Sequence, residues 1–186
     1  MLQPGDRAPA PAPLAAVQDL ANTVDIEAGR DALRTVDDLA AFCAEHGLPG
    51  LTLGPADVAE ARRLREALRD VCQAHTGTDV PAEVLATLDD QFRRAPLAVA
   101  VDPTGRARPV PVPGLPGVSA LVAEIGRSIL TAVADGTWPR LKACAAHECR
   151  WVYYDRSPAG RSRWCTMSIC GSRAKMRAYR RRARPG

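Results

Sequence analysis

Four cysteines near the C-terminus form two matched pairs. Four residues separate Cys144 from Cys149, fifteen residues follow, and four residues separate Cys165 from Cys170. A structural zinc ion takes four thiolates at about 2.3 Å in a tetrahedron and keeps no open position. A segment this short and this charged buries too little apolar area to fold alone, whereas zinc contributes about 10 to 16 kcal/mol in finger peptides. The pattern therefore predicts one structural Zn²⁺ bound by all four cysteines.

Other interpretations of these cysteines stay open in the sequence. They could be reduced thiols packed in a core, or His147 could replace one of them as a ligand. A catalytic zinc is disfavoured, because it normally has three protein ligands and a nearby acid or base, and Glu148 is the only carboxylate in the first pair. The first residues lack the basic and apolar regions of a secretory leader, so we expect a reducing compartment, where short-spaced cysteines bind metal more often than they form disulfides.

The residues between the two pairs suggest a hairpin. Residues 151–155 are strand-like, 157–160 form a turn, and Arg163 and Trp164 are expected to return as a second strand that brings Cys165 beside Cys149. Alternation places Trp151 and Tyr153 on one face and Val152 and Tyr154 on the other. Aromatic side chains beside arginines also suggest stacking on unpaired RNA bases, although we expect most of them to pack around the metal.

The charge of the chain is divided sharply. Residues 139–186 carry 13 lysines and arginines against two acids, a net charge of +11, whereas the first 138 residues carry 12 basic and 19 acidic side chains, a net charge of −7. A helix over 172–182 would place Arg173, Arg177 and Arg181 on one face, a cluster that only a polyanion makes favourable. We expect base or phosphate contacts from Arg173, Arg177, Arg180, Arg181 and Lys175, and backbone contacts from Arg161 and Arg163. A solvated tail, RNA binding and a protein-interaction scaffold are the alternatives.

The first 138 residues predict a mainly helical domain. Apolar periodicity, caps and breakers indicate helices over 14–22, 36–46, 55–76, 81–93 and 117–134, with a β-hairpin near 97–112. We expect a disordered lead-in over 1–13, a helical domain over 14–137 and the basic metal module over 138–186. Cys43 and Cys72 lie on apolar helix faces and are expected to be buried hydrophobes.

The run Arg163-Trp164-Cys165-Thr166-Met167-Ser168-Ile169-Cys170-Gly171-Ser172-Arg173-Ala174-Lys175 resembles the C-terminal motif of CGNR-type zinc-finger proteins. In that family the motif follows a Cys-x4-Cys pair and a hairpin and leads into a basic helix. Thr166 stands where the family has Ser, and Ser172 where it has Asn. The resemblance implies a treble-clef-like zinc finger with four cysteine ligands, in a bacterial-type regulator that binds DNA. Ser172 is then expected to take the role of that Asn, either capping the helix or contacting a nucleic-acid phosphate.

Residues 20–25 resemble the "Leu-x-Asn-Thr" opening of the helical ABATE domain that usually precedes this finger. Such proteins are described as stress-induced transcription regulators, so the resemblance implies a domain that senses a small-molecule effector or partner, or dimerises. Asn22, Thr23 and Asp25 are the candidate ligand-binding residues, against the simpler explanation of a cap or turn between helices. No catalytic constellation is present, and no stretch is long enough to span a membrane. We expect a non-enzymatic cytoplasmic protein, associated with the nucleoid when bound.

Overall fold

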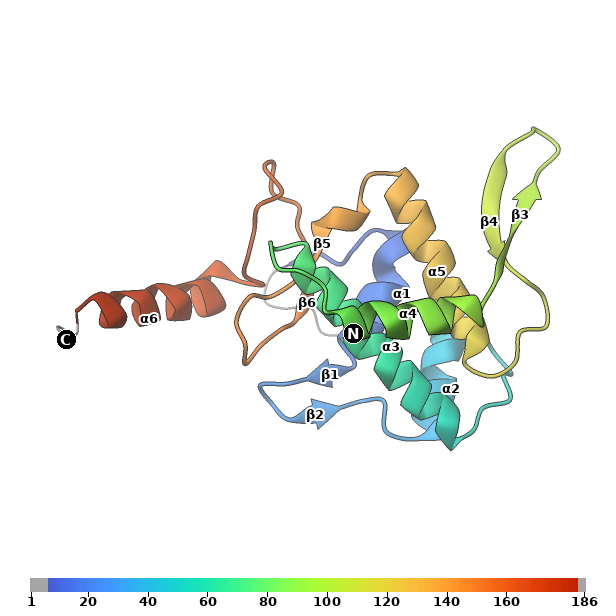
Figure 1. Ribbon diagram of the computed structural model, residues 1–186, viewed down its shortest axis with the longest axis horizontal. Coiled ribbons are helices and arrows are strands. Elements are labelled where there is room, and N and C mark those ends of the chain that lie inside the picture. Colours follow the sequence, from blue (N-terminus) through green and yellow to red (C-terminus); the bar gives the residue numbers. More distant parts are fainter. Residues whose placement is uncertain (1–6, 184–186) are drawn as a thin grey trace.

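The protein is mainly helical, as the sequence predicts, and the computed structural model describes residues 7–183. Five helices form the body, and a sixth projects from one end of it, while a β-hairpin projects from the other end (Figure 1). The helices are α1 Ala12–Ala21, α2 Val36–Glu45, α3 Pro55–Ala74, α4 Ala82–Arg93, α5 Ser119–Ala134 and α6 Ser172–Arg182. The strands pair in sequence order into three antiparallel two-stranded sheets, β1 Val24–Asp25 with β2 Arg30–Asp31, β3 Leu97–Val101 with β4 Ala107–Pro111, and β5 Leu141–Ala143 with β6 Val152–Tyr154.

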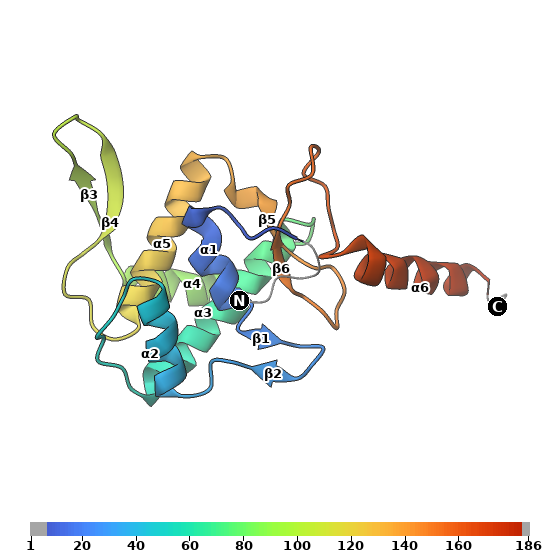
Figure 2. The same cartoon turned by 180° about the vertical axis from the view of Figure 1, so that it is seen from behind.

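The core lies where α1, α3 and α5 meet. Helix α1 is almost wholly enclosed, because α5 packs along one side and α3 along another (Figures 1 and 2). Each of these helices contributes fully buried leucines, such as Leu14, Leu64 and Leu121. Cys43 and Cys72 are buried in the same core, as predicted, and burial raises the pKa of Cys43 to about 11 and that of Cys72 to about 12. Both thiols are therefore inert side chains of the core.

The lead-in differs from the prediction of disorder over 1–13. Residues 1–6 lie outside the described part of the chain, but residues 7–13 are held in place. The Arg7 guanidinium donates to the carbonyl oxygens of Cys165 (2.8 Å) and Trp164 (3.1 Å), and the Ala10 N–H donates to the Gln18 side chain (2.7 Å). The Arg7 bonds satisfy two carbonyl groups of the C-terminal module, which gives the lead-in a structural role that composition alone did not indicate.

The hairpin of the C-terminal module also differs from the expected one. Strand β6 pairs with β5, which precedes the first cysteine pair, and not with Arg163 and Trp164. The backbone of Arg163 instead accepts a hydrogen bond from the Ala145 N–H (2.9 Å). The predicted alternation is confirmed. Val152 and Tyr154 join the main helical core, whereas Tyr153 and the half-buried Trp151 pack around the cysteines. One short hairpin thus belongs to two cores.

Candidate metal centre and basic helix

The four predicted cysteine ligands come together at one point. The sulfur atoms of Cys144, Cys149, Cys165 and Cys170 all lie within 4.8 Å of one another, and the Cys149–Cys165 and Cys165–Cys170 pairs are 3.6 Å apart. A tetrahedron with zinc–sulfur bonds of about 2.3 Å has edges of about 3.8 Å, so these separations suit zinc. The alternative ligand His147 is exposed and lies outside this group. The four cysteines form the site of one structural zinc ion.

Each cysteine is placed by a distinct backbone element. Cys144 follows β5, and Cys149 ends a tight turn in which its N–H and that of Arg150 donate to the Ala146 carbonyl, both at 3.0 Å. Arg150 then takes a left-handed conformation (φ 47°), which aims the chain into β6. Cys170 lies in a π-helical turn over Met167–Gly171 that runs directly into α6. The metal therefore fixes the origin of α6.

Hydrogen bonds within the cluster favour the thiolate at Cys144 in particular. Hydrogen bonds from the Cys149 and Cys165 thiols, and then from the backbone N–H groups of Cys165 and Ala146, hold the pKa of Cys144 well below its usual range. The same sharing raises the pKa of Cys149, because its proton bridges to Cys144. Four thiolates this close repel one another unless a cation lies between them, and zinc supplies that charge when bound. Its role is to cross-link the two cysteine pairs.

A buried ion pair organises the loop between the cysteine pairs. The Lys142 ammonium lies 3.0 Å from the Asp155 carboxylate, and both side chains are almost inaccessible. Asp155 also accepts from the N–H groups of Ser157 (3.0 Å) and Ser162 (2.8 Å). Burial by itself raises the pKa of Asp155, but these bonds and Lys142 outweigh burial and bring the pKa below its usual value. The sequence signal was present, because Asp155 is one of two acids in a basic segment, but sequence reasoning gave it no role.

The basic helix α6 is exposed along its whole length. None of its residues is buried, and it extends away from the rest of the molecule (Figure 1). A groove of about 510 Å³ follows one side and is lined by Ser168, Ile169, Ser172, Arg173, Met176, Arg177 and Arg180. Three of the predicted contact arginines therefore share a face, while Arg161, Arg163, Lys175 and Arg181 are exposed elsewhere on the module. The Ser172 hydroxyl donates to the Met167 carbonyl (3.0 Å), so it bonds back to the π-helical turn and does not cap the helix.

Two carboxylates lie against the arginines of this groove. The Arg173 guanidinium lies 2.6 Å from the Glu27 carboxylate, which belongs to the turn between β1 and β2. Arg177 lies 3.8 Å from the Glu148 carboxylate in the first cysteine knuckle. All four side chains are about half exposed or more, and exposed pairs of this kind are worth about 0 to 1 kcal/mol each.

Asn22 connects the helical body to the metal module. Its side-chain oxygen accepts the Val152 N–H (2.9 Å), and its side-chain amide donates to the Val152 carbonyl (2.8 Å). Val152 and Tyr154 are the residues of β6 whose peptide groups point away from β5, and at Val152 the Asn22 amide occupies the place of a third strand. Asn22 also ends α1 as its C-cap residue, so the simpler explanation of a cap describes its backbone, while its side chain makes this connection in addition. Sequence reasoning identified the residue but not its partner.

Asn22, Thr23 and Asp25 do line a common hollow. It has a volume of about 570 Å³ and is bounded also by Gly29, Arg30, Asp31, Ala32, Arg34 and Trp151. The Thr23 hydroxyl donates to the Leu20 carbonyl (2.8 Å), and the Asp25 carboxylate accepts from the Ala28 N–H (2.9 Å) and lies 3.1 Å from the Arg30 guanidinium. The hollow lies between the β1–β2 turn and the metal module, so both units contribute to its walls.

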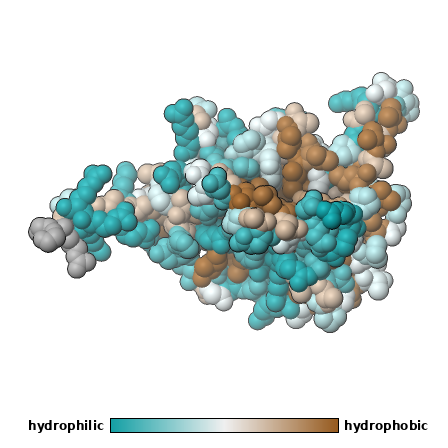
Figure 3. Space-filling model, viewed as in Figure 1, coloured by the Kyte–Doolittle hydropathy of each residue, from teal (hydrophilic) through white to brown (hydrophobic). Residues whose placement is uncertain are grey.

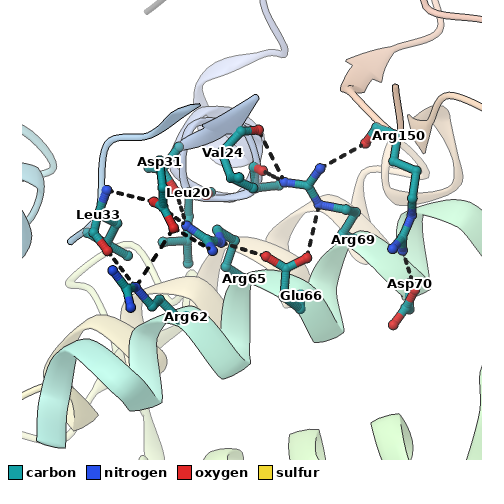
Figure 4. A network of polar contacts seen from close by, with 12 residues as sticks. Leu20, Val24, Asp31, Leu33, Arg62, Arg65, Glu66, Arg69, Asp70 and Arg150 are labelled. Carbon is teal, nitrogen blue, oxygen red and sulfur yellow. Dashed lines mark hydrogen bonds and ion pairs between the residues drawn. The ribbon is translucent and has the colours of Figure 1, made fainter. Parts of the chain in front are cut away.

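A row of arginines on α3 supports the β1–β2 segment from below (Figure 4). Arg62 and Arg65 both lie against the Asp31 carboxylate, and Arg62 donates to the Leu33 carbonyl (2.7 Å). Arg69 is wholly buried, donates to the carbonyls of Ala21 and Arg150, and has its pKa lowered by burial. One helix thereby holds both the β1–β2 segment and the first cysteine knuckle, a network that the helical pattern of the sequence did not indicate.

The four aromatic side chains that lie between the cysteine pairs are largely enclosed. Tyr153 and Tyr154 are buried, and Trp151 and Trp164 are half buried around the cysteines. These four residues therefore pack within the protein, whereas Tyr179 on α6 is 68% exposed beside arginines. In residues 7–183, no helix combines the length and the apolar character needed to cross a membrane.

Two family models match the chain. The ABATE model, described as "Putative stress-induced transcription regulator", covers residues 14–136, and the CGNR zinc finger model covers residues 140–183. A comparison with curated proteins gives no match. The first match alone spans about two thirds of the sequence, and the second contains all four cysteines of the metal site and the whole of the basic helix.

Proposed function

The chain belongs to the ABATE family, whose model is described as "Putative stress-induced transcription regulator", and it ends in a CGNR zinc finger; we propose that it regulates transcription by binding DNA through α6, while its N-terminal helical domain senses a small molecule. The observation that carries this proposal is the exposed basic helix anchored at Cys170. Six of its eleven residues are basic and none is acidic, so a polyanion is the partner that its charge favours. Its length of about 16 Å suits a major groove about 12 Å wide.

The Glu27–Arg173 and Glu148–Arg177 ion pairs support a mode of binding in which DNA phosphates replace the two glutamates. In the free protein the two carboxylates neutralise arginines that would otherwise repel their neighbours on the helix. A phosphate is a stronger partner for a guanidinium than an exposed carboxylate, because it offers more acceptor oxygens and belongs to a dense array of charge. DNA would displace the two glutamates at small cost and take their places along the groove.

A salt titration of binding to duplex DNA tests this proposal. The variant Arg173→Ala/Arg177→Ala should bind more weakly and reduce the slope of log K against log salt by about 1.8, which corresponds to two phosphate contacts. Arg63→Ala/Arg93→Ala is the matched control, since it removes the same charge from exposed positions on the helical body. Equal slopes for the two variants would move the contact surface elsewhere. Tighter binding to RNA or to an acidic protein than to duplex DNA would favour the other partners.

The hollow beside β1 and β2 is the proposed effector site. Arg30 and Arg34 at its edge favour a small molecule with a carboxylate or phosphate, and Trp151 offers an aromatic wall. A panel of small carboxylates and phosphates should contain members that raise the melting temperature of the zinc-loaded protein, and Arg34→Ala should abolish the rise. The absence of any stabilising compound, or an unchanged rise in Arg34→Ala, would contradict this site.

The remaining parts of the proposal concern chemistry and location. We assign the protein no enzymatic activity, because four cysteines fill the coordination of zinc and leave no place for a substrate. We place it in the cytoplasm, on the nucleoid when bound to DNA. Fluorescence imaging of a tagged copy, with Arg173→Ala/Arg177→Ala as the control that should lose nucleoid association, tests the location.

A further inference from the structure

The β3–β4 hairpin has two different outer edges. The Asp102 N–H donates to the Arg106 carbonyl (3.0 Å) and the Val112 N–H to the Pro96 carbonyl (3.2 Å), in line with the register that pairs Ala98 with Val110. In an antiparallel pair the peptide groups of alternate residues face the partner strand and those between them face outward. The outward residues are therefore 97, 99 and 101 on β3 and 107, 109 and 111 on β4.

Prolines block the outer edge of β4. Pro109 and Pro111 occupy two of its three outward positions, where a missing N–H leaves the β3–β4 ladder intact but prevents another strand from pairing. The outer edge of β6 is covered at Val152, where Asn22 bonds both the N–H and the carbonyl. Natural sheets protect their exposed edges in these ways against unwanted pairing.

The outer edge of β3 has no such protection. Its outward residues are Leu97, Val99 and Val101, with no proline and no charge in the strand, and Val99 and Val101 are 74% and 67% exposed. Strand β4 lies next to α5 and β3 on the far side of the hairpin, which projects from the body (Figures 1 and 2). Apolar atoms continue along the hairpin and onto the adjoining helical surface (Figure 3). Within residues 7–183, no second strand pairs with this edge of β3.

We propose that β3 pairs with β3 of a second copy of this chain in an antiparallel, two-fold symmetric dimer. In the register that places Val99 opposite its own equivalent, Leu97 lies opposite Val101 of the second copy, and Val101 opposite Leu97. Each outward peptide group of one strand then meets an outward peptide group of the other, which gives six hydrogen bonds without any offset. Because the strand carries no charged side chain, the symmetric pairing brings no like charges together.

The size of the contact sets the expected affinity. Two paired five-residue strands bury less than the roughly 800 Å² per partner of a standard interface, so the dimer should be reversible in the micromolar range. The hairpin and α6 lie at opposite ends of the molecule, and pairing through β3 leaves both basic helices uncovered (Figure 1). Dimerisation is measured without DNA and does not depend on the proposed function, so the two can fail separately.

Sedimentation velocity of the zinc-loaded, full-length protein over a range of micromolar concentrations tests the proposal. Wild-type protein should shift from monomer to dimer with concentration. Val99→Pro removes an outward N–H from each copy, and so both central hydrogen bonds, and should raise the dissociation constant about tenfold or more. Position 99 lies opposite Pro109 of β4, which already carries a proline at an outward position without breaking the ladder, so the hairpin should stay folded in Val99→Pro.

Two further variants separate an edge contact from other causes. Ala107→Pro is the matched control, because it puts a proline at an outward position of the edge that is already blocked, and it should leave the dissociation constant unchanged. Val99→Lys keeps the N–H but sets two ammonium groups opposite each other, and it should also weaken the dimer. A wild-type protein that stays monomeric throughout, or a dimer that Val99→Pro and Val99→Lys leave intact, would overturn the proposal.

Discussion

Replacing Asn22 with alanine tests how the zinc module is attached to the helical body. Asn22 is 7% exposed, and its side chain forms both of its short bonds with the peptide groups of Val152. In Asn22→Ala the Val152 carbonyl keeps a weaker donor, the Gln18 amide at 3.2 Å, but the Val152 N–H loses its acceptor. The substitution therefore leaves one buried donor without a partner.

The magnitude follows from these two bonds. A net loss of about 1 kcal/mol for the bond to the carbonyl, and of about 1 to 3 kcal/mol for the orphaned N–H, gives a destabilisation of about 2 to 4 kcal/mol. Asn22→Asp should cost at least as much, because a carboxylate can accept the Val152 N–H but repels the Val152 carbonyl. If Asn22 acted only on a ligand, neither substitution would change the stability of the ligand-free protein.

Urea denaturation of the zinc-loaded protein measures this loss as a decrease in the free energy of unfolding. Asp25→Ala is the matched control, since Asp25 lines the same hollow but bonds only within the β1–β2 turn, and it should cost less than about 1 kcal/mol. A decrease below about 0.5 kcal/mol in Asn22→Ala would refute the docking role, and a loss of equal size in both variants would show that the hollow is fragile as a whole.

Three further predictions concern charge, pH and metal. Glu27→Gln should tighten DNA binding by up to about fivefold at low salt, because Arg173 no longer exchanges partners, and weaker binding in an anisotropy assay would contradict this. Burial lowers the pKa of His75, whose Nδ1–H donates to the Leu141 carbonyl (2.7 Å), so its NMR titration midpoint should fall below 6.5. Stability should then be complete above pH 6.5 and decline as the pH falls through the window down to that midpoint, and His75→Gln should remove this slope. Chelating zinc should reversibly melt α6 in far-UV circular dichroism, since eleven exposed residues cannot hold a helix alone, and an unchanged spectrum would contradict its anchoring at Cys170.

The elements that local sequence determines were predictable. Capping residues and apolar periodicity located the helices to within a few residues, as at Thr35, whose side chain forms a capping box with Asp38. The four cysteines were predictable for a similar reason, because tetrahedral zinc chemistry restricts their spacing. Ser172–Arg182 begins and ends where the sequence predicts, since the metal ligand at Cys170 fixes its start.

Contacts between distant residues were not predictable in the same way. Nothing near Val152 in the sequence identifies Asn22 as its partner across 130 residues, and strand propensity favoured Arg163 and Trp164 over Leu141 as the pairing strand. The arginine row on α3 has ordinary helical spacing and acquires its role only when Asp31 and the Arg150 carbonyl are brought above it. Each contact that the sequence failed to predict involves a polar group whose partner is set by the tertiary fold, and the secondary-structure preferences of nearby residues do not identify such a partner.

The shared hairpin separates what zinc controls from what the helical body controls. Val152 and Tyr154 are held in the main core and by Asn22, so β6 has anchors that do not involve the metal. Helix α6 has no buried residue and is joined to the body through the π-helical turn at Cys170 and the exposed pair with Glu27. Zinc therefore fixes the direction in which α6 leaves the metal site, while the helical body fixes the position of the metal module. The β1–β2 segment contributes both Glu27 and residues of the hollow. A ligand bound in the hollow would therefore influence α6 through the Glu27–Arg173 ion pair and not through the packed core.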